Sequence, residues 1–435
     1  MNPGRLSRRL SGSFGLGLLD QGFQSAITFG LTIVAARSVG PSGLGAVALG
    51  FAALLIPAGL QRALVIDPYV TYREGVGSDA DAYRAALSMS LATGLIFSVA
   101  FVLGGAVSDG ALHQGLLTFA PWVAPYLVQS LYRAAAFRHG RGSAAVGVSA
   151  LSLALFGALL AIGLRGSVSG VVAAWGLGMT GGAVAALSLS SAIPAGPRGA
   201  WRWFRWDALP FGRWLACATA LFTTSTYVVL VLLSTILGPA AVGGYRAIES
   251  AFSPLSLVAV GLTNPGVREL RDAVVTGRGE VRIAAALGGV AAAATGTYAL
   301  VLSNWEHGLM RLLGSQFEPY LFLVAPIAVG QVILALALGF ELLLKVKRRG
   351  RLFLPVGILS PLAAVISAPL SAAYGGLEAA AWAIALSGVL SSAWSVLAAL
   401  RTSRRPHFAL RVDTVGDATE LSRRPLAGRI RRGPA

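Results

Sequence analysis

The chain has 435 residues, of which 55% are hydrophobic and only 12% are charged. Soluble domains carry about 25% charged residues, so this composition excludes an ordinary soluble enzyme and favours a membrane protein. The chain has 35 Lys and Arg residues against 18 Asp and Glu residues, a formal net charge of +17. Basic residues beside membrane spans set the orientation of a membrane protein, and we interpret the excess as this signal rather than as a sign of nucleic-acid binding.

Apolar runs long enough to cross a bilayer as helices recur along the whole chain. They predict an all-α polytopic membrane protein with about twelve transmembrane helices. We expect the spans at 12–36, 43–70, 85–107, 114–135, 143–164, 168–192, 213–237, 240–263, 283–303, 319–344, 353–374 and 377–400.

The basic residues fall almost entirely on one side of these spans. Arg37, Arg165 and Arg311 lie in outward turns, Arg62 and Arg246 lie within helices, and the other 30 lie in segments predicted to be cytoplasmic. Because basic residues near span ends stay on the cytoplasmic side, both termini are predicted to be cytoplasmic.

Two short patterns divide the chain into halves. Gly-Pro followed by a Gly four residues after the Pro occurs at Pro41 and again at Pro239. Six spans separate the copies, so both enter the membrane in the same direction, which predicts two parallel, pseudo-symmetric six-helix lobes around a central cavity. We expect an N-terminal lobe at 1–192, a cytoplasmic interfacial linker at 193–213, a C-terminal lobe at 214–402 and a basic disordered cytoplasmic tail at 403–435.

The linker interleaves aromatic and basic residues between Trp201 and Trp214. Trp favours the headgroup layer and Arg favours lipid phosphates, so this segment is predicted to lie on the inner leaflet. The tail after Arg401 can act as a topology signal or bind anionic lipid, and both interpretations stay open.

The first span carries a polar stripe. Asp20, Gln24 and Thr28 recur every four residues and therefore lie on one helix face, and Thr223 belongs to a milder stripe on the seventh span. Polar groups inside a membrane usually face a cavity or a partner. We therefore predict that these residues bind substrate or a coupling ion across a central cleft.

Three charged residues inside spans extend this candidate site. Arg62 is expected either to pair with Asp20 or to face water beside it, and such a pair could serve a cavity or only helix packing. Arg246 and Glu249 are three residues apart and can pair within one helix, although Arg246 could instead contact an anionic substrate.

Prolines occupy corresponding spans of the two halves. Pro57 and Pro254 each remove a backbone hydrogen bond and permit a bend, so both are candidate hinges, or simply ordinary prolines within membrane helices. The single cysteine, Cys217, excludes an internal disulfide and is expected to be a buried thiol.

The sequence carries no phosphate-binding Gly-rich loop, no Cys cluster and no paired-His metal motif. We therefore expect no enzymatic activity, no cofactor and no metal. Without an ATP site, we expect any energy to come from an ion gradient, from the membrane potential or from removal of the product downstream.

Several segments resemble a known family. The two Gly-Pro turns, the segment Leu313-Gly314-Ser315-Gln316-Phe317 and the opening Leu18-Leu19-Asp20-Gln21-Gly22 are similar to polysaccharide biosynthesis proteins of actinobacterial type. These are lipid-linked oligosaccharide flippases of the multidrug/oligosaccharidyl-lipid/polysaccharide exporter superfamily.

The resemblance implies a flippase in the bacterial cytoplasmic membrane. It would move a polyprenyl-diphosphate-linked oligosaccharide from the inner to the outer leaflet by alternating access, for polysaccharide export. Its partners would be the lipid bilayer, the lipid-linked glycan, a coupling ion (H⁺ or Na⁺) and other polysaccharide assembly proteins, and no nucleic acid. The alternatives are a drug/cation antiporter of the same superfamily and a membrane glycosyl polymerase or ligase, which the short outward loops disfavour.

Overall fold

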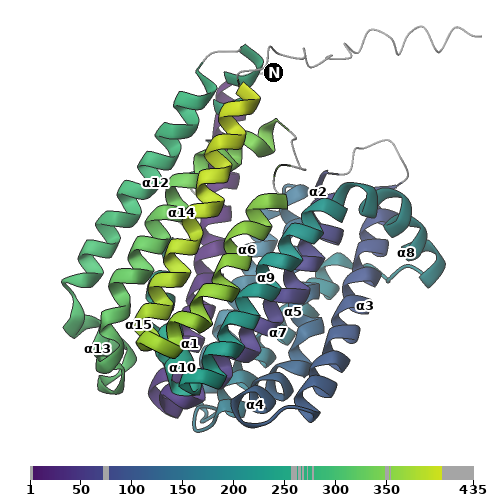
Figure 1. Ribbon diagram of the computed structural model, residues 1–435. Helices are drawn as coiled ribbons and strands as arrows, with labels where there is room; N and C mark the ends of the chain where they lie inside the picture. The colour runs from purple at the N-terminus through teal and green to yellow at the C-terminus, as the bar shows by residue number, and fades with distance from the viewer. Residues whose placement is uncertain are drawn as a thin grey trace, which may run out of the picture.

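A computed structural model describes residues 3–71, 78–255, 262, 266, 269–271, 273–276, 279–347, 352 and 354–403. Within these ranges every regular element is helical (Figure 1). In the first half the elements are α1 (Pro3–Gln61), η1 (Arg62–Ile66), α2 (Asp67–Thr71), α3 (Asp79–Ala106), α4 (Gly110–Phe119), η2 (Ala120–Trp122), α5 (Val123–Arg138), α6 (Gly142–Ala161) and α7 (Val168–Ser190). They continue with α8 (Pro197–Trp203), η3 (Phe204–Ala208), α9 (Leu209–Leu237), α10 (Pro239–Ala251), α12 (Glu280–Ser303), α13 (Glu306–Leu313), η4 (Ser315–Leu323), α14 (Val324–Val346) and α15 (Leu354–Ser403).

Two of the helices each contain two predicted spans. The backbone of α1 leaves helical geometry at Gly40, with φ 70° and ψ −176°, and α15 does so at Gly376, with φ 69° and ψ −160°. Glycine adopts such positive φ values without the steric penalty that a Cβ imposes. The breaks predicted between the spans 12–36 and 43–70, and between the spans 353–374 and 377–400, are therefore confirmed.

Eight helices in the described ranges are long and apolar enough to cross a membrane, and two of them are these double helices. These eight helices account for ten of the twelve predicted spans. In the remaining two, 114–135 and 240–263, the helix is interrupted near a proline. The 3₁₀ turn η2 separates α4 from α5 at Pro121, and α10 ends at Ala251 just before a turn that contains Pro254. The described residues thus fit the predicted fold of twelve helices in two lobes, with the eighth span followed continuously only to Leu255.

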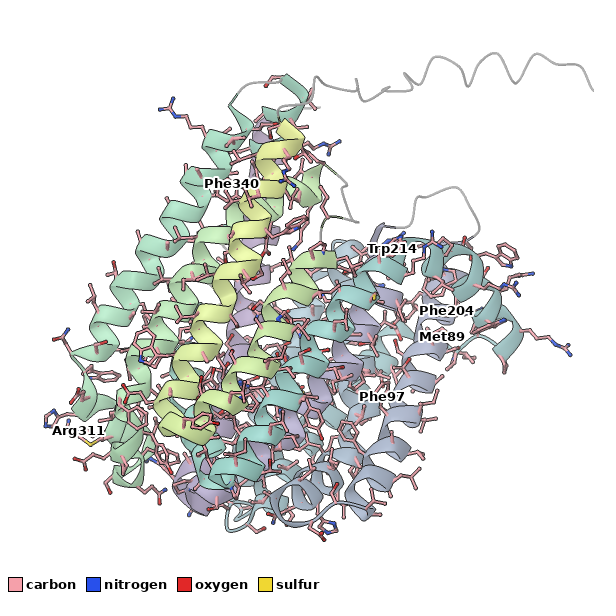
Figure 2. The ribbon with its side chains drawn as sticks, in the orientation of Figure 1. Met89, Phe97, Phe204, Trp214, Arg311 and Phe340 are labelled. Carbon is pink, nitrogen blue, oxygen red and sulfur yellow. The ribbon has the colours of Figure 1, made fainter. Side chains whose placement is uncertain are left out.

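The first lobe is formed by α1 to α7, which we call the N-lobe, and the second by α9 to α15, which we call the C-lobe. The helix α1 begins near the end of the bundle where α2 and α8 lie, and α4, the start of α10 and α13 lie at the opposite end (Figure 1). We call these the terminal end and the turn end. Figure 2 marks the two ends with Trp214 and Arg311, respectively.

At the turn end the two Gly-Pro motifs lock the lobes together. A Cβ on Gly45 would lie 2.1 Å from the carbonyl oxygen of Pro239, and a Cβ on Gly243 would lie 1.9 Å from that of Pro41. Each motif's second glycine therefore lets the backbone of the other lobe approach, as small residues do where membrane helices meet.

Side-chain hydrogen bonds add to this contact at the turn end. Gln316 donates from Nε2 to the carbonyl oxygen of Ala36 at 2.5 Å. Arg37 donates from Nε to the carbonyl oxygen of Leu312 at 2.9 Å and also bonds the carbonyl of Arg311. Each of these bonds joins the N-lobe to the C-lobe.

The predicted linker contains two short helical elements, α8 and η3. Trp203 and Ala208 are buried, whereas Trp201 and Trp206 are exposed, which is the amphipathic pattern expected at a membrane surface. The domain limits at 193–213 stay a prediction, and the predicted tail lies outside the described residues after Ser403.

One expectation about the core is wrong. Cys217 is exposed on α9 instead of buried, although its neighbours Ala216 and Ala218 are buried.

Candidate functional site

Two adjoining cavities lie between the helices of the two lobes. The larger, about 500 Å³, is lined mainly by the N-lobe, and the smaller, about 400 Å³, mainly by the C-lobe. We call them the N-lobe cavity and the C-lobe cavity. Thr28 and Ser253 line both, so the two cavities meet at these residues.

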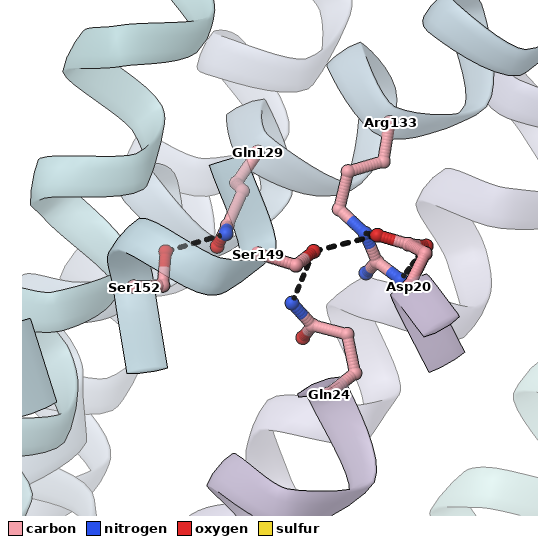
Figure 3. A network of polar contacts seen from close by, with 6 residues as sticks. All are labelled: Asp20, Gln24, Gln129, Arg133, Ser149 and Ser152. Carbon is pink, nitrogen blue, oxygen red and sulfur yellow. Dashed lines mark hydrogen bonds and ion pairs between the residues drawn. The ribbon is translucent and has the colours of Figure 1, made fainter. Parts of the chain in front are cut away.

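Asp20 forms the centre of the polar groups in the N-lobe cavity (Figure 3). Asp20 is buried, with 4% of the residue exposed. Its carboxylate accepts hydrogen bonds from two nitrogens of the Arg133 guanidinium on α5, one to each oxygen. Nε of Arg133 lies 3.0 Å from Oδ1, and Nη2 lies 2.5 Å from Oδ2. Paired N–H donors of this kind make strong, directional bonds to carboxylates.

The bonds around Asp20 continue onto α6. Ser149 donates to Oδ1 of Asp20 at 2.6 Å, and Gln24 donates to the Ser149 hydroxyl at 3.0 Å (Figure 3). Beside them, Gln129 on α5 donates to Ser152 at 2.8 Å. Asp20 and Gln24 therefore turn toward α5 and α6 of their own lobe.

Thr28 lies one turn further along the same stripe. Its hydroxyl donates to the carbonyl oxygen of Gln24 at 3.1 Å, and the residue borders both cavities. The stripe thus leads from an ion pair inside the N-lobe to the junction of the two cavities.

The predicted direct pair between Asp20 and Arg62 is wrong. Arg133 is the partner of Asp20, while Nε of Arg62 lies 3.8 Å from Asp67. Arg62 and Asp20 nevertheless line the same cavity, and the Arg62 side chain is 77% exposed, which agrees with the alternative that both groups border a water-accessible space.

The predicted pair between Arg246 and Glu249 is confirmed. Nη1 of Arg246 donates to Oε2 of Glu249 at 2.6 Å, and both residues line the C-lobe cavity. The guanidinium of Arg246 also lies 5.5 Å from the ring centroid of Phe51, which is a cation–π distance. Because Phe51 belongs to α1, this contact links the two lobes beside the cavities.

The structure does not bring Thr223 to the cavities. Its hydroxyl donates to the carbonyl oxygen of Thr219 at 2.8 Å. Its methyl carbon would lie 3.3 Å from a Cβ placed on Gly59 of α1. Thr223 therefore packs α9 against α1, and the described residues that line either cavity do not include it.

The two candidate hinges differ. The helix continues through Pro57, with a five-residue π-turn, η1, beginning at Arg62. At Pro254 the regular helix has already ended, since α10 stops at Ala251. The role of both prolines as hinges stays a prediction.

Arg133 is the residue that the sequence prediction missed. It lies at the cytoplasmic end of the predicted fourth span, 114–135, and is therefore grouped with the cytoplasmic basic residues. In the structure it belongs to α5 and lines the N-lobe cavity. A signal was available: Gln129 and Arg133 are four residues apart and share a helix face, the spacing that also relates Asp20 to Gln24.

The three arginines that line the two cavities differ in how closely a carboxylate binds them. Asp20 and Glu249 each bind an arginine closely, at 2.5 and 2.6 Å, respectively. The third arginine, Arg62, reaches its carboxylate only at 3.8 Å. The N-lobe cavity can therefore attract an anionic group through Arg62, and hydroxyls through Gln24 and Thr28. Among the described residues, no group of three or more His, Cys, Asp or Glu side chains could hold a metal ion.

The sequence of the chain matches no protein-family model and no curated protein. Its fold, however, is similar to solved membrane transporters. One is an inward-facing multidrug resistance MATE family transporter of the MOP superfamily, with a TM-score of 0.66 and 14% identity over 87% of this chain and 94% of that one.

Two further structures share the fold. An outward-facing multidrug resistance MATE family transporter gives a TM-score of 0.62 at 15% identity, over 93% of this chain and 96% of that one. A MOP superfamily transporter from Pyrococcus furiosus, described as having a binding pocket of reverse polarity, gives 0.61 at 15% identity over the same shares. The chain therefore has the twelve-helix fold of the MATE transporters.

Proposed function

We propose that the protein is a transporter of the MOP superfamily fold that moves a polyprenyl-diphosphate-linked oligosaccharide across the bacterial cytoplasmic membrane by alternating access. The observation that carries the proposal is the pair of adjoining cavities between two lobes that are tightly joined at the turn end. Proteins of the same fold have been captured facing inward and facing outward, which supports a cycle that opens each end in turn.

The chemistry of the cavities supports an anionic substrate head. Three arginines and two carboxylates line them, namely Arg62, Arg133 and Arg246 with Asp20 and Glu249. Guanidinium groups match the geometry of phosphate oxygens, and the exposed Arg62 is the natural first contact for a diphosphate. The sugar hydroxyls would meet Gln24, Thr28 and Gln331, while the polyprenyl chain would stay in the bilayer.

The orientation follows the basic residues. The terminal end would face the cytoplasm with both chain termini, and the amphipathic α8 and η3 would lie on the inner leaflet, joining a first lobe at 1–192 to a second at 214–402. The turn end, sealed in this structure, would then face outward, and Pro57 and Pro254 would absorb the bend when it opens.

A drug/cation antiporter is the second candidate, because the two MATE neighbours are described as multidrug resistance transporters. A cationic drug needs an available carboxylate. Both cavity carboxylates are already bound to arginine here, so the electrostatics favour the lipid-linked anion.

A reconstitution experiment tests the proposal. The full chain in liposomes should move a fluorescent polyprenyl-diphosphate-linked disaccharide between leaflets, as measured by loss of fluorescence to a membrane-impermeant quencher. Arg62→Ala should reduce the rate at least about tenfold and Arg62→Lys less, because Lys keeps the charge but loses the two-pronged geometry.

The same liposomes provide the contrary outcome. If they exchange an organic cation such as ethidium for protons and leave the labelled lipid in place, the antiporter is correct and the flippase is wrong. Equal loss in Arg62→Ala and Arg62→Lys would mean that phosphate geometry at Arg62 plays no part.

A further inference from the structure

A row of exposed arginine and tryptophan side chains follows α8, η3 and the start of α9, outside both cavities. These elements lie at the terminal end of the bundle, where α8 packs against α3 (Figure 1), and Phe204 and Trp214 mark them in Figure 2. We propose that this row, which we call the linker surface, binds the headgroups of anionic phospholipids at the junction of the two lobes. Its members are Trp201, Arg202, Arg205, Trp206, Arg213 and Trp214.

The linker has a buried side and an exposed side. Trp203 and Ala208 are buried in a cluster that includes residues of α2, α3 and α5. Arg202, Arg205 and Trp206 are exposed, and their spacings of three and four residues place them near one another on a helix. Because Trp203 anchors the linker to the N-lobe, the exposed side chains form a surface of fixed position.

The arginines of the linker surface carry charge that no carboxylate neutralises. Within the ranges that the structure describes, Arg202, Arg205 and Arg213 are exposed and form no ion pair with Asp or Glu. Between Ile193 and Trp214 the sequence has four arginines and one carboxylate, Asp207. An unpaired guanidinium can bind an oxyanion without first losing another partner. The charge of this surface therefore favours an anionic ligand.

Two of these arginines lie over indole rings. The guanidinium carbon of Arg205 lies 5.3 Å from the centroid of the Trp206 ring, and that of Arg213 lies 5.5 Å from the centroid of the Trp214 ring. Both are cation–π distances, and the N–H groups at the edge of a guanidinium match the oxygens of a phosphate. Indole rings in turn favour the headgroup layer of a bilayer. Each Arg–Trp pair thus combines a contact for a lipid phosphate with a membrane anchor.

The two Arg–Trp pairs flank a contact between the lobes. A Cβ on Gly212 would collide with the carbonyl oxygen of Ala63 in η1, so the start of α9 packs against the backbone of the N-lobe. Trp206 precedes this contact along the chain, and Trp214 follows it on the first helix of the C-lobe. Lipid headgroups bound at both pairs would therefore touch the linker on the N-lobe and the C-lobe helix that it leads into.

The net charge of a headgroup decides which lipid binds. Phosphatidylglycerol keeps the negative charge of its phosphate, whereas the choline of phosphatidylcholine balances that charge. Basic residues near an anionic membrane surface each add to the binding energy, while an aromatic anchor without free arginines would bind both lipids equally. A preference for phosphatidylglycerol that depends on the linker arginines is therefore the signature of the proposed surface.

Native mass spectrometry of the purified full chain in detergent tests the proposal. The probes are phosphatidylglycerol and phosphatidylcholine with the same acyl chains. The wild type should bind phosphatidylglycerol about tenfold more tightly, and Arg205→Gln/Arg213→Gln should lose most of that preference. Arg205→Lys/Arg213→Lys should lose about threefold, because Lys keeps the charge but not the planar group that stacks on indole and binds phosphate with two N–H groups.

Two double variants serve as matched controls, since each also removes two positive charges. Arg165→Gln/Arg311→Gln does so at exposed positions of the turn end, and Arg423→Gln/Arg424→Gln does so in the basic tail. Both should bind phosphatidylglycerol as tightly as the wild type does.

Three results would overturn the proposal. Equal affinity of the wild type for the two lipids would leave the linker as a plain aromatic anchor. A preference lost in the tail variant and kept in Arg205→Gln/Arg213→Gln would assign lipid binding to the tail. If the Gln variant does not fold, unchanged affinity of Arg205→Lys/Arg213→Lys for phosphatidylglycerol would decide against the Arg–Trp pairs. None of these results bears on the proposed flippase activity, because the measurement uses no transported substrate.

Discussion

The turn end and the N-lobe cavity both involve α1, but α1 packs against α10 at the turn end and lines open space with η1 and α5 at the cavity. At the turn end, Gly45 and Gly243 let the backbones of the two lobes touch, and a Cβ there would approach a carbonyl oxygen to about 2 Å. In the cavity, Asp20, Arg62 and Arg133 border open space, and an ion pair occupies the wall. Small residues therefore seal one end of the bundle, and charged side chains keep the region behind the seal polar.

This contrast implies different sensitivities to substitution. The seal is built from backbone, which cannot rotate away from an added methyl group. The cavity wall is built from charged side chains. Removing one of them lowers the stability of the protein mainly through electrostatics, because the charge of its partner is left buried and unpaired.

The largest loss of stability is expected for Arg133→Ala. It leaves the buried Asp20 carboxylate without its cation and should lower the free energy of unfolding by about 3–5 kcal/mol. The double variant Asp20→Asn/Arg133→Ala should regain part of that loss. Reversible denaturation in mixed micelles, analysed as a double-mutant cycle, measures both. Additive losses in the cycle would mean that the two residues do not stabilise each other.

The next largest effect is expected for Gly45→Ala. Its methyl group would meet the carbonyl of Pro239, so the lobes must separate at the turn end at a cost of about 1–3 kcal/mol. Spin labels placed on the two lobes at this end, in a Cys217→Ser background, should show a longer distance than in the parent protein.

Gly22→Ala is the matched control for that substitution. Gly22 lies on the same helix, and a Cβ there would have nothing within 4 Å. Its label distance should equal that of the parent, and a similar lengthening in both variants would show that the Gly45 contact does not close the turn end.

A smaller effect is expected for Gln316→Ala. It removes the hydrogen bond to the carbonyl oxygen of Ala36 and should cost about 1 kcal/mol of unfolding free energy. Gln114→Ala on α4 is a suitable control, since Gln114 is exposed. Equal stability of the two variants would mean that the Gln316 bond adds nothing to the seal.

The smallest effect on stability is expected for Arg62→Ala. Its guanidinium is exposed and lies 3.8 Å from Asp67, so its loss should change the unfolding free energy by less than about 1 kcal/mol. Transport of the lipid-linked substrate should nevertheless fall. A loss of stability as large as that of Arg133→Ala would assign Arg62 a structural role instead.

Much of the fold could be predicted because its signals are local. Apolar runs located the spans, and Gly40 and Gly376 marked turns through a backbone conformation that glycine favours. The spacing of Arg246 and Glu249 predicted their pair correctly, because neighbours three residues apart on a helix lie on one face.

The pairing of Asp20 could not be predicted in the same way. Depth along the membrane made Arg62 a reasonable partner, but the choice among helices depends on how they rotate and pack. Arg133 lies 113 residues from Asp20, and nothing local relates them. Thr223 illustrates the same limit, since it packs against Gly59 and lines neither cavity.

The amino-acid sequence by itself determined which segments cross the membrane, where they turn and how the two halves correspond, because hydrophobicity and glycine geometry act over a few residues. Only the tertiary structure decided that the two Gly-Pro motifs interlock and that Arg133 holds Asp20. Those contacts depend on the relative rotation and distance of helices that are far apart in the chain, and close packing of the whole bundle sets both.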